Sequence, residues 1–109
     1  MMSTSLEGLT LHVTDVERSR DFYARLPGLV LERERADEFV LFRVGDQWLG
    51  LLQTRDPGFH IELAVPDLDG AYARLRESGV EPRDRPRARG WGERTFLVAD
   101  PDGHLIEFQ

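Results

Sequence analysis

The chain has 109 residues, of which 40% are hydrophobic and 31% are charged, as expected for one soluble globular domain. Its formal net charge of -6 argues against DNA or RNA as the main partner, because phosphate contacts need a basic surface. The absence of cysteine excludes disulfides, thiolate metal sites and a cysteine nucleophile. No apolar run approaches membrane length and the start lacks a signal-peptide pattern, so we expect a cytoplasmic protein with no membrane partner.

The first half of the chain predicts a strand, a helix and three strands. An alternating strand at residues 8–14 leads to Asp15, a carboxylate at the N-cap position of a helix. Pro27-Gly28 is predicted to end this helix. Its buried stripe is predicted to contain Val16, Phe22, Tyr23 and Leu26. The strand signals that follow are LVLERE, EFVLFRV and QWLGLLQ.

The second half repeats this order. A strand in FHIELAV precedes Asp67, the second predicted N-cap, and Gly79 ends the helix. The predicted stripe of this helix is Leu68, Ala71, Tyr72 and Leu75. A weak strand signal at 80–84 is followed by RTFLVAD and HLIEFQ, and residues 83–92 form the one long stretch predicted to be irregular.

The predicted fold class is α+β, with two βαβββ modules in tandem at residues 6–54 and 59–109 of a single domain, 1–109. Each module has about fifty residues, near the size at which a lone core is marginal. On each first strand the apolar side chains alternate with mixed ones. We expect the apolar faces to lie under the helices and the mixed faces to enclose a shared cleft, within one chain or between two.

Three segments carry a resemblance to a known family: HVTDVERSRDFYARLPGL at 12–29, FHIELAVPDLDGAYARLRESGV at 59–80 and WGERTFLVADPDGHLIEF at 91–108. Together with the doubled element order, they resemble the vicinal oxygen chelate superfamily, which includes glyoxalase I, bleomycin-resistance proteins and extradiol dioxygenases. The resemblance implies paired βαβββ modules, a small-molecule ligand and a homodimer.

The resemblance also implies a metal site in the second module. Metal-using members carry a ligand seven residues before the N-cap Asp and another on the last strand, and these positions match His60 and Glu107. The equivalent positions of the first module are Gly8 and Gly50. One imidazole and one carboxylate suit Zn, Ni, Mn or Fe, whose sites usually take three or more protein ligands. The alternative is that His60 and Glu107 bind each other, or a substrate, in a polar pocket.

Two further residues on the mixed faces are candidates for catalysis. His12 shares a face with position 8 but lies about 13 Å further along the strand, too far to replace Gly8 on the same ion. It is either an acid or base in the pocket wall or a satisfied strand histidine. Glu62 faces the same way as His60 and could move protons.

The expected wall of the cleft is aromatic and cationic. Its candidates for binding a substrate, besides His12, are Phe39, Arg43, Trp48, Trp91 and Arg94. These side chains predict a pocket for a flat organic molecule, or else they fill the cleft or seal a dimer themselves.

Three functions follow from these alternatives. The first is a small-molecule-binding protein that sequesters a drug without needing a metal. The second is a lyase, isomerase or dioxygenase with a divalent ion held by His60 and Glu107. The third is an interaction module whose cleft is closed by its own side chains.

Overall fold

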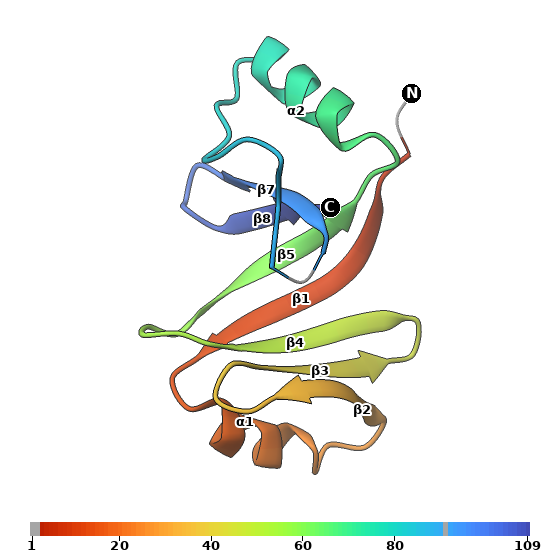
Figure 1. The fold of residues 1–109 in the computed structure, drawn as a ribbon, viewed down its shortest axis with the longest axis vertical. Coiled ribbons are helices and arrows are strands. Elements are labelled where there is room, and N and C mark those ends of the chain that lie inside the picture. The colour runs from red at the N-terminus through yellow and green to blue at the C-terminus, as the bar shows by residue number, and fades with distance from the viewer. Residues whose placement is uncertain (1–2, 91) are drawn as a thin grey trace. The chain divides into compact units, whose positions relative to one another are not determined.

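The computed structural model describes residues 3–90 and 92–109, which form eight strands and two helices of an α+β fold (Figure 1). The predicted order of a strand, a helix and three strands is found twice. The elements are β1 (Ser5–Val13), α1 (Val16–Tyr23), β2 (Leu29–Arg35), β3 (Phe39–Val44), β4 (Gln47–Gln53), β5 (Gly58–Ala64), α2 (Leu68–Glu77), β6 (Arg87–Ala88), β7 (Arg94–Ala99) and β8 (Leu105–Phe108). Neither helix in the described part of the chain is long and apolar enough to cross a membrane.

The contacts of the chain divide it into two compact units. One is Glu7–His60, and the other combines residues 3–6 with Ile61–Gln109, so the division falls inside β5. In the unit Glu7–His60 the strands lie in the order β2-β3-β4-β1. Strands β2, β3 and β4 are antiparallel, whereas β1 runs parallel to β4 with Gly8 opposite Trp48.

The core of the unit Glu7–His60 lies between α1 and one face of its strands. Val16 of α1 packs against Val40, Phe42 and Leu51, all of which are at most 3% exposed. Leu11 and Val13 of β1 pack on the edge of this cluster, as the strand alternation predicts. In this unit the alternation along β1 therefore places its apolar side chains on the side of α1.

The predicted helix ends are right at three of four places. The Asp15 side chain accepts a hydrogen bond from the Arg18 N–H (3.1 Å), and Asp67 does the same for Gly70 (3.0 Å), so both N-caps are confirmed. Gly79, with a φ of +93°, follows α2.

Helix α1 is shorter than predicted, because it ends at Tyr23, before Pro27-Gly28. Its predicted stripe is therefore wrong at its C-terminal end. Phe22 is 55% exposed and Leu26, which lies beyond the helix, is 38% exposed. With only eight residues, α1 has room for little more than Val16 and Tyr23 on its buried side.

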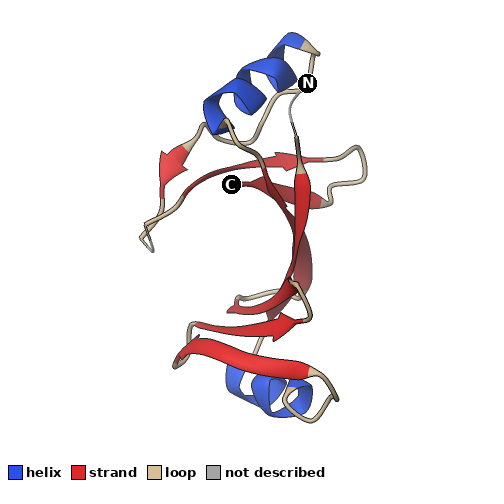
Figure 2. Ribbon diagram, turned by 90° about the vertical axis from the view of Figure 1, so that its right-hand side faces the viewer, coloured by secondary structure: helices blue, strands red, loops and turns tan. Residues whose placement is uncertain are grey.

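In the other unit the strands lie in the order β5-β8-β7-β6, and α2 lies beside them (Figure 2). The N–H of Val65 donates to the carbonyl of Gln109, and the N–H of Gln109 donates to the carbonyl of Leu63, both at 2.9 Å. This pattern is that of parallel pairing, in which Gln109 lies opposite residue 64. The core contains Phe96, whose ring lies 5.0 Å from Phe108 and 5.4 Å from Tyr72 of α2.

The segment between α2 and β7 differs from the prediction. Residues 80–84 form no strand, and a two-residue strand, β6, lies instead within the stretch that was predicted to be irregular. Pro82 and Pro86 lack the N–H that a paired strand needs. Two hydrogen bonds attach the segment to β7, one between two backbone groups and one from a backbone N–H to a side chain. Arg83 N–H donates to the Leu97 carbonyl, and Leu97 N–H donates to the Asp84 carboxylate, both at 2.8 Å.

Candidate metal centre

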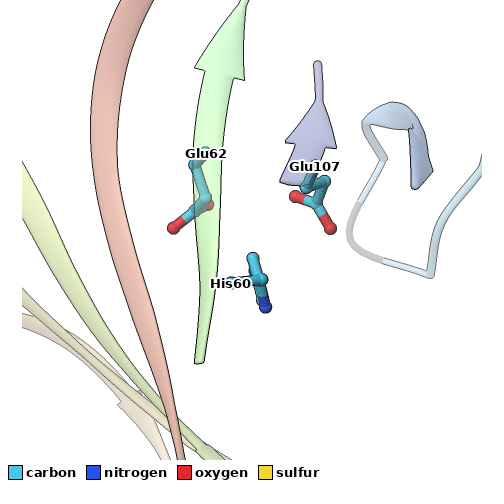
Figure 3. A group of neighbouring side chains, drawn as sticks. All are labelled: His60, Glu62 and Glu107. Carbon is cyan, nitrogen blue, oxygen red and sulfur yellow. The ribbon is translucent and has the colours of Figure 1, made fainter. Parts of the chain in front are cut away.

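Strands β5 and β8 bring together one imidazole and two carboxylates, those of His60, Glu62 and Glu107 (Figure 3). The possible ligand atoms of these three residues all lie within 4.8 Å of one another. His60 and Glu62 are two residues apart on β5, so they share a face. Because Gln109 lies opposite residue 64, the same parallel register puts Glu107 opposite Glu62.

His60 is buried, with 9% of its surface exposed, and it is held by another histidine. Its Nδ1 lies 2.9 Å from Nε2 of His12, which is half-buried on β1. Burial, and after it the charge of His12, lowers the pKa of His60 to about 4. Burial also lowers the pKa of His12. His60 is therefore a neutral imidazole at pH 7, the form that binds metal ions.

Glu107 carries an opposite shift. Burial raises the pKa of this carboxyl to about 7, and the charge of Glu62 is the next largest cause. Glu93 and Asp84 raise the pKa further, whereas the guanidinium of Arg89 lowers it. The local field around Glu107 is thus negative, and a divalent cation beside Glu62 and Glu107 would offset it.

This donor set fits a divalent transition metal. One imidazole nitrogen and two carboxylate oxygens suit Zn, Mn, Fe or Ni, and three protein ligands leave positions for water or a substrate. From the sequence, Glu62 was predicted only to move protons and was missed as a ligand. The signal was its spacing of two residues from His60 on an alternating strand.

The positions of β1 and β4 that correspond to His60 and Glu107 have no room for ligand side chains. A Cβ on Gly8 would lie 1.9 Å from the carbonyl oxygen of Trp48, and its φ of +156° is one that other residues rarely adopt. A Cβ on Gly50 would lie 2.7 Å from Oγ1 of Thr10. Strands β1 and β4 are thus closed against each other where β5 and β8 carry His60 and Glu107.

The other predicted binding residues of that unit are already engaged. Arg43 and Trp48 lie opposite each other in the β3–β4 pair. The Arg43 Nε donates to Glu32 Oε1 at 2.7 Å, an ion pair at the surface. The guanidinium of Arg33 lies 5.6 Å from the centre of the Phe39 ring. Phe39 and Trp48 are half-buried.

In the other unit, Arg94 and Asp69 form a two-pronged ion pair, with N···O distances of 2.9 and 3.2 Å. The pair is exposed and connects β7 to α2. Trp91 lies outside the described residues. Arg89, which lies in the stretch 83–92 that was predicted to be irregular, is mostly buried, with 14% of its side chain exposed, and it binds Asp84 and Thr95.

Comparison with known proteins places this arrangement in a family. The sequence profile of the Glyoxalase/Bleomycin resistance protein/Dioxygenase superfamily matches residues 5–108. Glutathione transferase FosA of Serratia marcescens is 30% identical over 117 aligned positions, which cover 97% of this chain and 80% of that protein.

Two solved structures share the fold. Methylmalonyl-CoA epimerase from Mycobacterium tuberculosis has a TM-score of 0.79 at 23% identity, covering 94% of this chain and 85% of that one. The Mn(II)-bound glyoxalase from Novosphingobium aromaticivorans has a TM-score of 0.77 at 22% identity, covering 99% of this chain and 39% of that one. The chain therefore belongs to the Glyoxalase/Bleomycin resistance protein/Dioxygenase superfamily.

Proposed function

We propose that this protein is a divalent-metal-dependent enzyme of the glyoxalase type, with His60, Glu62 and Glu107 as the metal ligands. Its substrate would be a small organic molecule with neighbouring oxygen atoms, on which it performs lyase, isomerase or group-transfer chemistry. The bound ion would supply Lewis acidity to those oxygens. The observation that carries the proposal is the grouping of three donor atoms within 4.8 Å on β5 and β8.

The three side chains divide the work of holding the ion. His60 offers a neutral nitrogen, and its burial keeps that nitrogen unprotonated well below pH 7. Glu107 offers a carboxylate whose negative surroundings favour a cation. Glu62 completes the set of three, which matters because Gly8 and Gly50, the corresponding positions of β1 and β4, offer no donor.

Relatives support this choice of chemistry. One relative at 30% identity is a glutathione transferase, and one structural neighbour is a glyoxalase with bound Mn(II). Another neighbour is an epimerase. Among these three proteins, one is named as a transferase, one as an epimerase, and one contains a divalent ion.

The test is the metal content and affinity of the purified protein. We expect stoichiometric transition metal in protein prepared without added metal or chelator, as measured by elemental analysis. We expect His60→Ala and Glu107→Gln to lower the affinity for titrated Mn(II) or Zn(II) by at least about 100-fold. Loss of a residue that only hydrogen-bonds a metal ligand already lowers metal affinity by about 10–100-fold. Glu77→Gln, an exposed acid on α2, is the matched control. Unchanged affinity in both site variants would end the proposal.

A second candidate is sequestration of a small molecule without a metal. It is favoured by the half-buried Phe39 and Trp48 and by the closed glycine positions of the unit Glu7–His60. A ligand held in this way should raise the melting temperature equally with and without a chelator, because binding to the folded state stabilises it. The stabilisation should survive in His60→Ala and be lost in Trp48→Ala.

We also propose a homodimer, as the family resemblance implies. Several large apolar side chains are exposed in the single chain, among them Leu6, Phe22, Val30 and Leu31. Light scattering coupled to size-exclusion chromatography should give twice the mass of the chain. A monomer at micromolar concentration would contradict this assignment.

A further inference from the structure

His12 lies next to the proposed metal centre without belonging to it. Its Nε2 is 2.9 Å from Nδ1 of His60, and the two ring centres are 5.1 Å apart with the planes inclined by 55°. Two neutral imidazoles at this distance share one proton, so one ring donates and the other accepts. The structure therefore admits two directions for this hydrogen bond, and they have different consequences for the metal centre.

In one direction, the Nδ1–H of His60 donates to His12. The Nε2 of His60 then keeps its lone pair and can bind an ion. In the other direction, the Nε2–H of His12 donates to His60, and the single proton of His60 must sit on its Nε2. That nitrogen cannot then coordinate a metal, and Nδ1 is already occupied by His12. Metal binding through His60 thus requires His12 to be the acceptor.

We propose that His12 is a positioning residue, which accepts the Nδ1–H of His60 and so fixes the tautomer and ring orientation in which His60 Nε2 binds the ion. This inference rests on the proposed function. Metal-binding histidines generally donate their second ring N–H to a neighbouring group, which is commonly a carboxylate or a carbonyl. Here that neighbour is a second imidazole.

The position of His12 on β1 explains why it has this role. It lies on the same face as Gly8, four residues further along the strand. The backbone of Trp48 leaves no room for a ligand side chain at position 8 itself. The unit Glu7–His60 therefore has no donor at Gly8 or Gly50, yet it holds the partner that orients the buried His60.

The experiment compares three variants of the full chain by titrating the metal-free protein with Zn(II) alone. His12→Phe keeps a ring but removes the acceptor, and we expect its affinity to fall by about 10–100-fold. His12→Gln keeps an oxygen that can accept the Nδ1–H, and we expect its affinity to stay within about threefold of the wild type. His104→Phe, which removes an exposed turn histidine bound to Asp100, should change nothing. Circular dichroism establishes that each variant is folded.

Nitrogen NMR of the zinc-loaded wild type gives a second readout. We expect the proton of His60 on Nδ1 and zinc on Nε2. Binding through Nδ1, or wild-type affinity in folded His12→Phe, would overturn the role of His12 while leaving the metal site intact. If His12→Phe does not fold, the NMR assignment alone decides the question. A wild type that binds no Zn(II) or Mn(II) overturns the proposed function, and the role of His12 with it.

Discussion

The two units place different residues at the same rung of their paired strands. In the unit Glu7–His60, β1 and β4 are parallel and Thr10 lies opposite Gly50. In the other unit, β5 and β8 are parallel and the register places Glu62 opposite Glu107. In the first pair the Thr10 hydroxyl lies beside Gly50, which has no side chain, whereas the second pair consists of two carboxylates.

The difference shows what each rung does for stability. The Thr10–Gly50 rung lets the strands lie close together, with no charge to bury. The Glu62–Glu107 rung keeps two acids near each other, and the raised pKa of Glu107 shows that its ionised form is unfavourable there. Residues that destabilise the metal-free fold in this way are expected at a site with a function.

The largest expected effect comes from copying the histidine of β5 into the corresponding position of β1. Gly8→His puts a Cβ 1.9 Å from the carbonyl oxygen of Trp48, and backbone cannot move aside as a side chain can. We expect a loss of at least about 3 kcal/mol in the free energy of unfolding, measured by chemical denaturation. Gly90→Ala, at a glycine with open space around it, should change little. A stable Gly8→His protein that binds additional metal would refute the comparison.

A smaller cost is expected for copying the carboxylate. In Gly50→Glu the new Cβ meets Oγ1 of Thr10 at 2.7 Å, and this obstacle is a side chain. We expect a destabilisation of about 1–3 kcal/mol. Because Thr10→Ala removes the obstructing oxygen, the double variant should recover about 1 kcal/mol relative to the sum of the single changes. Strict additivity in this cycle would show that the hydroxyl is not what closes the rung.

The smallest expected effect is a pH-dependent change in stability caused by Glu107, which has no counterpart at Gly50. The pKa of Glu107 is raised from 4.5 to about 7, so between these pH values the folded protein binds more protons than the unfolded chain. Stability must then fall as the pH rises through this window. In metal-free protein, Glu107→Gln should remove that loss and be more stable than the wild type by about 1–2 kcal/mol at pH 8, after allowing for solvent screening.

This advantage should almost vanish near pH 4.5, where Glu107 is protonated in the folded state. Thermal melts of both proteins from pH 4.5 to pH 8 measure the difference. The opposite contribution of His60, whose pKa is lowered to about 4, is common to both proteins and cancels. A constant difference across the range would contradict the assigned shift of Glu107.

Much of the fold could be predicted because its signals are local. Alternation on the first strand placed Leu11 and Val13 on the face that packs against the cluster around Val16, and the two aspartates mark where the helices begin. Such patterns depend on neighbouring residues alone. The end of α1 and the two-residue β6 were missed, because short elements depend on what packs against them.

The sequence predicted only part of the candidate site. The family resemblance selected His60 and Glu107, and the strand period put Glu62 on the same face. The hydrogen bond between His12 and His60 and the closure of β1 on β4 at Gly8 came from the tertiary structure. A strand pattern determines which way a side chain points. How near it comes to a partner depends on the register and spacing of strands that are distant in sequence.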